Sequence, residues 1–320
     1  MKRALLTGGS GFIGANLARR LLADGHDVHL LVRPGFNGWR LEGIRDDIHL
    51  HEADITDQEA VERVLLGSRP DWIFHLAAHG AYPTETDLSR MLRTNVHGTI
   101  SMLSGALNTG VEAFVNAGSS SEYGFKDHAP SESELVEPNS NYAVTKASAT
   151  LFCRLVGWQS GANVTTLRLY SAYGPWEQPS RLMPTLVARG LEGRLPELAS
   201  PSIARDFVFV DDVVDAFLAA ANHPQSDPGA VYNIGTGVQT SLAEVVRLAR
   251  SELAISTEPQ WGSMEDRSWD TAVWVSDSGR ARNVLGWQPQ LTVREGFRRL
   301  VEWVKSSEVM AAYYRERAGP

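Results

Sequence analysis

Short apolar runs alternate with longer segments of helical periodicity through the first half of the chain. The apolar runs lie at residues 4–6, 27–32, 48–52, 72–78 and 112–117, and each has the length of a buried strand. Residues 15–23, 88–107 and 140–156 instead repeat apolar side chains at the spacing of one helix face. Strands that alternate with helices predict a doubly wound α/β fold, a parallel Rossmann-type sheet with helices on both faces.

A glycine-rich turn joins the first apolar run to the first helical segment. Its glycines Gly8, Gly11 and Gly14 are spaced one residue more widely than the G-x-G-x-x-G fingerprint of dinucleotide-binding folds. Glycines let the backbone approach a pyrophosphate, and the free N–H groups of a helix N-terminus favour its negative charge. We therefore predict dinucleotide binding at this turn. The alternative is a turn without a ligand.

The alternation becomes irregular after residue 170, where prolines recur at 175, 179, 184, 196 and 201. We expect a dinucleotide-binding domain in residues 1–170. Residues 171–320 form a smaller, interleaved and mainly substrate-binding portion, with some segments that return to the first sheet. Residues 300–314 predict one closing helix with a frayed tail behind it. The tryptophans of this half either line a pocket or anchor packing; they include Trp261, Trp269 and Trp274.

The composition is that of a globular protein and argues against several kinds of partner. A hydrophobic fraction of 43% and a charged fraction of 21% are ordinary for a globular protein, and the net charge of −8 argues against a nucleic-acid partner. A single cysteine, Cys153, excludes an internal disulfide and a cysteine-rich metal site, so we predict no metal. We find no apolar window near the roughly 18 residues that span a bilayer. We expect a cytoplasmic protein without a membrane partner.

The end of the second apolar run bears on the choice of cofactor. An NAD site usually carries an acidic residue about 20 positions beyond the fingerprint, where it binds the ribose 2′-hydroxyl. Arg33 stands there in this chain, and its guanidinium can pair with the 2′-phosphate of NADP, with help from Arg40. The alternative is that both arginines are solvated in a loop. NADP(H) is therefore favoured, and NAD(H) is the other candidate.

Other strand ends supply further candidate cofactor contacts. Asp54, followed by Ile55, can accept a hydrogen bond from an adenine amino group or cap the helix that starts near residue 57. The small residues that end the fourth run let the backbone lie close to a cofactor; they are Leu76, Ala77 and Ala78.

We predict a different role for each of three polar residues near the fourth run. His75 lies inside the apolar run and is predicted to be a core histidine with satisfied hydrogen bonds. His79 follows the run and is a candidate substrate contact. Asn95 interrupts a helical segment, where it either hydrogen-bonds backbone across the sheet or lies on a polar helix face.

The fifth apolar run leads directly into three serines, Ser119, Ser120 and Ser121. Ligands of a doubly wound sheet bind beyond the carboxyl ends of its strands, so these hydroxyls can face a substrate, although serine runs also occur in ordinary loops. Tyr142 and Lys146 follow, four positions apart and therefore on one helix face. A nearby ammonium would lower the pKa of Tyr142 from about 10 and suit it to proton transfer at a sugar or alcohol oxygen.

Taken together, these motifs resemble the extended short-chain dehydrogenases/reductases, which act mainly on nucleotide-linked sugars. The resemblance rests on residues 7–14, 74–78 and 119–124 and on Tyr142 with Lys146. It continues through residues 168–175, 205–212, 232–235 and 285–289. These stretches follow the family's order over nearly the whole chain.

The resemblance assigns roles to individual residues. Tyr142 would be the acid/base, Lys146 would hold the nicotinamide ribose, and Ser119 would bind the reacting oxygen with help from Ser120. Arg205 and Arg267 resemble the arginines that grip the nucleotide diphosphate. The positions that match the family's cofactor contacts are Gly8, Gly11, Phe12, Ile13, Asp54, Ala77 and Asn95. A homodimer through residues 88–107 and 140–156 is a further family-level expectation.

The chain also departs from the family pattern. The family's 4,6-dehydratases carry an acidic pair directly after the catalytic threonine, and Ser120 and Ser121 stand in those places. Glu122 occupies a position that is usually apolar. Ser171 replaces an asparagine at a position expected to face the substrate.

The expected function is a reductase that uses NADPH to reduce a keto group of a nucleotide-activated sugar, with Tyr142 as the acid. The alternative is an epimerase that oxidises a sugar hydroxyl with a retained cofactor and then returns the hydride to the opposite face. A non-catalytic NADP(H) sensor on the same fold is a third hypothesis.

Overall fold

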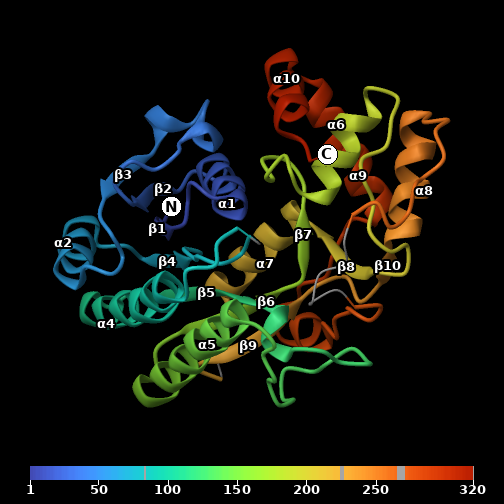
Figure 1. Ribbon diagram of the computed structural model, residues 1–320. Helices are drawn as coiled ribbons and strands as arrows, with labels where there is room; N and C mark the ends of the chain where they lie inside the picture. Colours follow the sequence, from blue (N-terminus) through green and yellow to red (C-terminus); the bar gives the residue numbers. More distant parts are fainter. Residues whose placement is uncertain (83, 224–226, 265–270, 320) are drawn as a thin grey trace.

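A computed structural model describes residues 1–82, 84–223, 227–264 and 271–319. Its centre is a seven-stranded sheet in the order β3-β2-β1-β4-β5-β6-β9 (Figure 1), in which every described pair is parallel. This arrangement confirms the predicted doubly wound Rossmann-type fold. The strands are β1 (Arg3–Thr7), β2 (Asp27–Val32), β3 (His49–Glu52), β4 (Trp72–His75), β5 (Ala113–Ser119), β6 (Val164–Leu169) and β9 (Ala230–Ile234).

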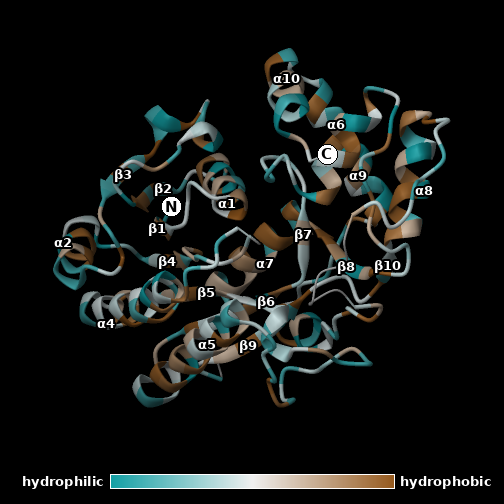
Figure 2. Ribbon diagram, in the orientation of Figure 1, coloured by the Kyte–Doolittle hydropathy of each residue, from teal (hydrophilic) through white to brown (hydrophobic). Residues whose placement is uncertain are grey.

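Helices cover both faces of the sheet because its strands alternate apolar side chains between the two faces. On β1, Leu6 packs with one group of core residues to which α1 (Phe12–Ala23) and α7 (Val210–Asn222) contribute. Leu5 points the other way, into the group that includes α2 (Gln58–Ser68), α4 (Gly98–Thr109) and α5 (Asn141–Ser160). Figure 2 shows hydrophobic colour on the central strands and polar colour on the outer turns of the helices.

A second, smaller core lies beside the main sheet. It is built on a three-stranded sheet in the order β10-β8-β7, with β7 (Ser171–Tyr173), β8 (Ala204–Phe209) and β10 (Gln239–Ser241). Around it pack α6 (Leu182–Gly190), α8 (Leu242–Leu253), α9 (Val293–Lys305) and α10 (Glu308–Arg317). Between β8 and β10 the chain returns to the main sheet, where β9 pairs with β6.

The expectation of one closing helix is wrong. The chain forms α9 and then α10, because Ser307 adopts an extended conformation and its hydroxyl accepts a hydrogen bond from Met310 N, which caps α10. The tail is also fixed rather than frayed. Arg189 Nε donates to Gly319 O at 3.0 Å, and Gly319 N donates to Thr185 Oγ1 at 3.1 Å.

The predicted helix over residues 88–107 is divided into α3 (Leu88–Met91), a π-helical segment η3 (Leu92–His97) and α4. A π-helical turn widens the backbone and is frequent at functional sites. The remaining short helical segments are η1 (Trp39–Leu41), η2 (Arg45–Asp47), η4 (Ser120–Tyr123) and η5 (Ala281–Leu285). Among the helices described, we find none with the length and hydropathy needed to cross a bilayer.

Candidate active site

The glycine turn after β1 brings two strand ends into contact. Gly8 has a φ of +68°, and a Cβ there would lie 2.6 Å from the carbonyl carbon of Leu76 and 2.7 Å from Ala77 N. A Cβ at Gly14 would collide with the Gly8 carbonyl oxygen, so its absence lets α1 pack directly on the turn. Among the described residues, a Cβ at Gly11 would meet only Gly8 O, at 3.1 Å, which leaves this side of the turn open.

The start of α1 suits an anion. Gly11 is its N-cap, and among the described residues no side chain caps this helix and no acid stands in its first turn. The uncapped N–H groups and the positive end of the helix dipole therefore point out of the turn. A pyrophosphate fits this arrangement. The half-buried Phe12 and Ile13 follow directly and pack toward the second core.

The strand ends next to the turn are held together by hydrogen bonds from two backbone N–H groups to Thr7. Leu76 N donates to Thr7 O at 3.1 Å, and Ala77 N donates to Thr7 Oγ1 at 3.2 Å. Leu76 and Ala77 are half-buried and Ala78 is exposed, so this backbone borders the turn at the carboxyl edge of the sheet. Ile55 is buried and packs over Gly98 behind it.

The two arginines proposed to read the cofactor's ribose lie in different environments. Arg33 is exposed, one residue beyond the end of β2. Arg40 is buried, and its guanidinium donates from Nε to Trp176 O at 2.7 Å and from Nη2 to Gln178 Oε1 at 3.1 Å. These hydrogen bonds give Arg40 a structural role, because they join the segment after β2 to the segment after β7. They occupy the guanidinium that was expected to assist Arg33.

Asp54 forms a local turn rather than a helix cap. Its Oδ1 accepts hydrogen bonds from Thr56 N at 2.9 Å and Thr56 Oγ1 at 2.8 Å. The cap of α2 is Asp57, which accepts from Ala60 N at 3.0 Å. Asp54 itself is exposed.

His75 is a core histidine with both ring nitrogens hydrogen-bonded, as predicted. Its Nδ1 lies 2.8 Å from Thr7 Oγ1 and its Nε2 lies 2.9 Å from Thr99 Oγ1. Burial, followed by the charge of Lys146, lowers the pKa of His75 to about 3. The ring is therefore neutral at physiological pH, and it links β1, β4 and α4.

Asn95 connects the segment after β4 to the helix that carries the candidate catalytic pair. Its Oδ1 accepts from His79 N at 2.8 Å, and its Nδ2 donates to His79 O at 2.8 Å and to Thr145 Oγ1 at 2.9 Å. Of the two expectations, backbone bonding is the one observed. The His79 side chain points to Glu85, with Nδ1 3.2 Å from Glu85 Oε1.

Ser119, Tyr142 and Lys146 meet where β5 ends and α5 begins. The Ser119 hydroxyl is near enough to lower the pKa of the Tyr142 phenol, and Lys146 lies one turn further along α5 with 4% of its surface exposed. Ser119 also lies 2.7 Å from Ser121, hydroxyl to hydroxyl. The structure thus brings together the three residues that the resemblance assigned to catalysis.

The expected lowering of the Tyr142 pKa by Lys146 is wrong for this structure. Burial raises the pKa of Tyr142 to about 12, and the negative charge of Glu122 raises it further, whereas the hydrogen bond from Ser119 opposes both. Burial also lowers the pKa of Lys146. At neutral pH the phenol is therefore protonated and able to donate a proton.

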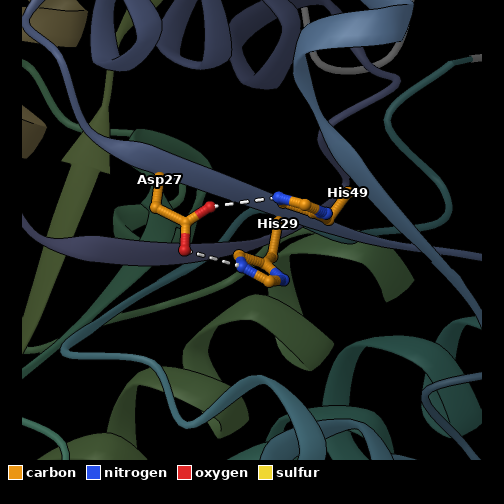
Figure 3. A group of neighbouring side chains, drawn as sticks. All are labelled: Asp27, His29 and His49. Carbon is orange, nitrogen blue, oxygen red and sulfur yellow. Dashed lines mark ion pairs between the residues drawn. The ribbon is translucent and has the colours of Figure 1, made fainter.

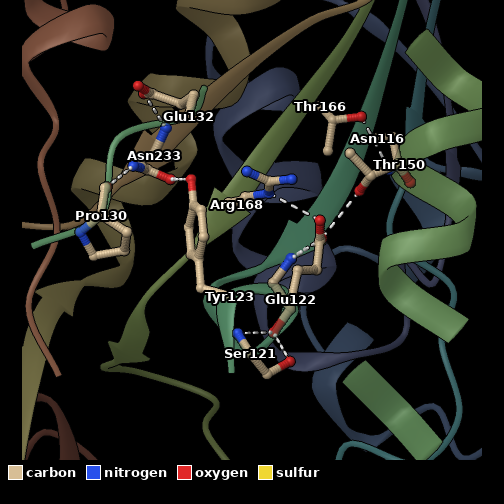
Figure 4. A network of polar contacts seen from close by, with 11 residues as sticks. Asn116, Ser121, Glu122, Tyr123, Pro130, Glu132, Thr150, Thr166, Arg168 and Asn233 are labelled. Atoms are coloured by element: carbon tan, nitrogen blue, oxygen red, sulfur yellow. Dashed lines mark hydrogen bonds and ion pairs between the residues drawn. The ribbon is translucent and has the colours of Figure 1, made fainter. Parts of the chain in front are cut away.

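Glu122 has a defined structural role that the sequence left unexplained (Figure 4). It is fully buried, and its Oε2 accepts from Arg168 Nε at 2.8 Å. Its Oε1 accepts from Ser119 N at 2.8 Å and Thr150 Oγ1 at 3.0 Å. The spacing from Ser119 to Glu122 is that of a capping box, and this signal could have been recognised in the sequence.

The same network continues from Arg168, near the carboxyl end of β6, to the carboxyl end of β9 (Figure 4). The Arg168 guanidinium lies over the Tyr123 ring at 4.5 Å, and Tyr123 OH donates to Asn233 Oδ1 at 2.8 Å. Asn233 N in turn donates to Glu132 Oε1 at 2.8 Å. The loop behind Ser119 is thereby fixed to the sheet.

Among the candidate substrate residues, Ser120 and Arg205 both lie next to Trp274, whereas Ser171 lies on β7. Ser120 is buried and accepts from Trp274 Nε1 at 3.2 Å, and the Arg205 guanidinium lies 5.4 Å from the Trp274 ring centre. Ser120 and Trp274 line a small hollow with Tyr170 and Lys126. Ser171 is half-buried on β7, where it pairs in register with Phe207. Arg267 and Trp269 lie outside the described residues.

Asp206, beside Arg205, organises the segments around this hollow. It is fully buried, and its oxygens accept hydrogen bonds from neutral donors on two segments. Thr236 N and Oγ1 donate to Oδ1 at 2.7 and 2.6 Å, and Gly237 N donates to Oδ2 at 2.9 Å. Ser276 N and Oγ donate to Oδ2 at 3.0 and 2.6 Å. No local motif in the sequence marks these long-range contacts.

Comparison with known proteins agrees with this geometry. The model of the NAD dependent epimerase/dehydratase family matches residues 4–235. UDP-glucose 4-epimerase of Mycolicibacterium smegmatis is 33% identical over 316 residues, which cover 95% of this chain and 99% of that protein. dTDP-glucose 4,6-dehydratase of Streptomyces griseus is 31% identical over 314 residues, with 93% of each chain covered.

A solved structure of MoeE5 in complex with UDP-glucuronic acid and NAD is also similar. It is 30% identical, superposes with a TM-score of 0.82, and covers 95% of this chain and 99% of its own. The chain therefore belongs to the NAD dependent epimerase/dehydratase family, among the nucleotide-sugar enzymes of the extended short-chain dehydrogenases/reductases.

Proposed function

We propose that this enzyme is a nucleotide-sugar epimerase that inverts a sugar hydroxyl with a nicotinamide dinucleotide that stays bound. The dinucleotide supplies a hydride acceptor that later returns the hydride. The glycine turn and the open N-terminus of α1 would hold its pyrophosphate, and Lys146 would hold its nicotinamide ribose.

The chain's own groups account for the proton transfers. Tyr142, as its phenolate, would accept the proton of the sugar hydroxyl during the oxidation and would return that proton to the keto oxygen during the reduction; burial, which raises the pKa of Tyr142, favours the return step. Ser119, whose hydroxyl acts on the Tyr142 phenol, would hold the same oxygen. Arg205 would pair with the diphosphate of the sugar nucleotide.

The observation that carries this proposal is the state of the carboxylates around Tyr142. Glu122 and Glu85 both act electrostatically on Tyr142, and both already have partners. Glu122 is paired with Arg168, and Glu85 accepts from Gly80 N at 2.9 Å and lies against His79. Elimination of water needs an acid and a base beyond the tyrosine, and Ser120 and Ser121 stand where dehydratases carry that pair. The epimerase is therefore favoured over the dehydratase.

The comparisons also favour the epimerase over the reductase expected from Arg33, because the first relative reported above is an epimerase. The test incubates the protein as purified with UDP-glucose or dTDP-glucose and follows the sugar by NMR. We expect the C4 epimer to form without added cofactor and without accumulation of reduced nicotinamide. Stoichiometric NADPH consumption with a keto sugar would establish a reductase instead, and a 4-keto-6-deoxy product would establish a dehydratase.

Replacing Tyr142 by phenylalanine tests its role. Loss of a positioned acid/base lowers kcat by roughly 10²–10⁴-fold, and we expect cofactor affinity to change little. Steady-state kinetics and cofactor titration would measure the two effects. Tyr313→Phe on α10 is the matched control. An unchanged kcat in Tyr142→Phe would contradict the acid/base role, whereas an unmodified protein that binds the cofactor and turns over no sugar would support the sensor hypothesis.

We further propose that Arg33 admits the 2′-phosphate of NADP(H). Its exposed guanidinium at the end of β2 would make a charge-assisted contact. Arg33→Asp should weaken NADP(H) binding by roughly 10–100-fold and leave NAD(H) binding nearly unchanged. Arg63→Asp, the same charge change on exposed α2, is the control. Equal losses for both cofactors would contradict the phosphate contact.

We also propose a homodimer through α5 and its neighbour α3–α4. The outer face of α5 exposes Leu151 by 56%, Leu155 by 42% and Trp158 by 79%. Apolar side chains this exposed on one helix face favour contact with a second copy. Leu155→Glu should give a monomer in light scattering after size exclusion, whereas Leu66→Glu on α2 should not. A monomeric unmodified protein would contradict this proposal.

A further inference from the structure

Two imidazoles and a carboxylate meet near the amino ends of β2 and β3, at the opposite edge of the sheet from the candidate active site. Asp27 and His29 are two residues apart on β2, and His49 on β3 pairs with His29 in the parallel register. Because side chains of a strand alternate between faces, Asp27 and His29 share one face. Figure 3 shows the carboxylate of Asp27 directed at both rings.

The separations suit one metal ion. His29 Nε2 lies 3.2 Å from Asp27 Oδ2, and His49 Nε2 lies 3.3 Å from Asp27 Oδ1. One donor atom from each of the three residues lies within 4.8 Å of the others. Tetrahedral zinc, with bonds of about 2.0–2.2 Å to nitrogen and oxygen, places its donors about 3.4 Å apart.

The hydrogen bonding of His29 provides a second observation. Its Nδ1 lies 2.8 Å from His51 Nε2, and its buried Nε2 lies 3.2 Å from Asp27 Oδ2 without the geometry of a hydrogen bond. With its proton on Nδ1, shared with His51, the ring would present the lone pair of Nε2 to a metal ion. A lone pair that faces a carboxylate is stable when a cation lies between them. A ligating histidine usually donates its other N–H in this way.

The charges around the cluster are compatible with a cation. A divalent cation binds imidazole in its neutral form and carboxylate in its charged form, which are the ordinary forms of these side chains at physiological pH. Arg3 Nε donates to Asp27 Oδ2 at 3.0 Å and is itself anchored to Ser68 O at 2.8 Å. Ligating carboxylates are commonly hydrogen-bonded, so Asp27 can keep Arg3 on one oxygen and offer the other.

We propose that Asp27, His29 and His49 bind one zinc ion, with water as the fourth ligand. Imidazole nitrogens and a carboxylate are ligands that Zn²⁺ prefers. The ion would join β3, a strand of 4 residues at the sheet edge, to β2. About 20 Å of strand separates Asp27 from Arg33, so the site would be structural and independent of catalysis. The single cysteine led to the prediction of no metal, and this site was missed because its ligands come together only when the two strands pair.

The test uses the full chain without an affinity tag, freed of metal by chelation and dialysis, and titrates it with Zn²⁺ by calorimetry. We expect one ion per chain. His49→Gln, which changes an exposed side chain, and Asp27→Asn should each weaken binding by at least about 100-fold. His51→Leu should weaken it by about 10-fold, as for loss of an outer partner.

Co²⁺ provides an independent readout, because its visible absorption reports coordination by the protein. We expect His49→Gln to lose this absorption and to lose the rise in Tm that Zn²⁺ gives to the unmodified chain. His97→Gln, an exposed histidine on η3, is the control and should behave as the unmodified chain. Absence of saturable binding, or equal binding by His49→Gln and the unmodified chain, would overturn the proposal.

Discussion

Glu122 and Asp206 are fully buried carboxylates in two different regions, and their charges are balanced in different ways. Glu122, behind Ser119, pairs with the guanidinium of Arg168. Asp206, beside the hollow at Trp274, accepts hydrogen bonds from the backbone and hydroxyls of Thr236, Gly237 and Ser276.

This difference shows two ways to place a charge inside a protein. An ion pair concentrates the balance in one partner, so loss of either member leaves an uncompensated charge. Oriented dipoles distribute the balance over several groups, and each of them contributes less. The first arrangement fixes the loop next to Tyr142. The second holds together segments that are far apart in the chain.

Glu122→Gln should have the largest effect on stability. It leaves the Arg168 charge buried without its partner and should lower the free energy of unfolding by about 3–5 kcal/mol. Urea denaturation would measure this loss. The control is Glu137→Gln, which breaks the exposed pair with Lys126 and should cost at most about 1 kcal/mol. Equal costs for the two variants would show that the buried Arg168 guanidinium does not need the negative charge of Glu122.

Asp206→Asn should have an intermediate effect. An amide group in place of Oδ2 cannot accept from Gly237 N and Ser276 N, and the unsatisfied donors should cost about 1–3 kcal/mol. We also expect a higher KM, because Arg205 is the next residue. Asp277→Asn, an exposed neighbour, is the control. A cost as large as that of Glu122→Gln would remove the distinction between the two regions.

His75 sharpens the comparison, because it is buried with neutral partners and remains uncharged. Its folded pKa of about 3 lies below the ordinary 6.5, so the unfolded chain takes up the proton first as the pH falls. The stability that His75 contributes is present above pH 6.5 and is lost as the pH falls toward 3.

This loss should be about 2 kcal/mol between about pH 7 and about pH 5, which is comparable with the effect of Asp206→Asn. Other groups add to the same slope, so the part due to His75 is the hardest of the three effects to isolate. Urea denaturation across this range would measure it. The slope should be shallower in His75→Gln than in the unmodified chain. Identical slopes would show that His75 is not the group responsible.

The sequence predicted the parts of the fold that depend on local pattern. β2 has the predicted bounds, and the glycine turn follows β1 as expected, because apolar runs and turn residues are determined by neighbours in the chain. Tyr142 and Lys146 lie on one face of α5 because helical spacing is regular.

The remaining features depend on residues far apart in sequence. Arg40 contacts residues 176 and 178, and Glu122 contacts Arg168, so neither partner could be chosen from local spacing. The pKa of Tyr142 follows from burial, which a helical pattern does not report. Pairing of β2 with β3 brings His49 to His29, and no motif marks that contact.

The late position of β9 has a consequence for synthesis of the chain. Residues 164–169 of β6 need residues 230–234 to cover their open edge, so a ribosome must extend the chain by some sixty residues before the sheet is complete. During that interval the nascent protein presents unpaired N–H and C=O groups to other chains. A fragment that stops at residue 170 would keep this edge permanently and would be prone to aggregate, which makes a chaperone useful during translation.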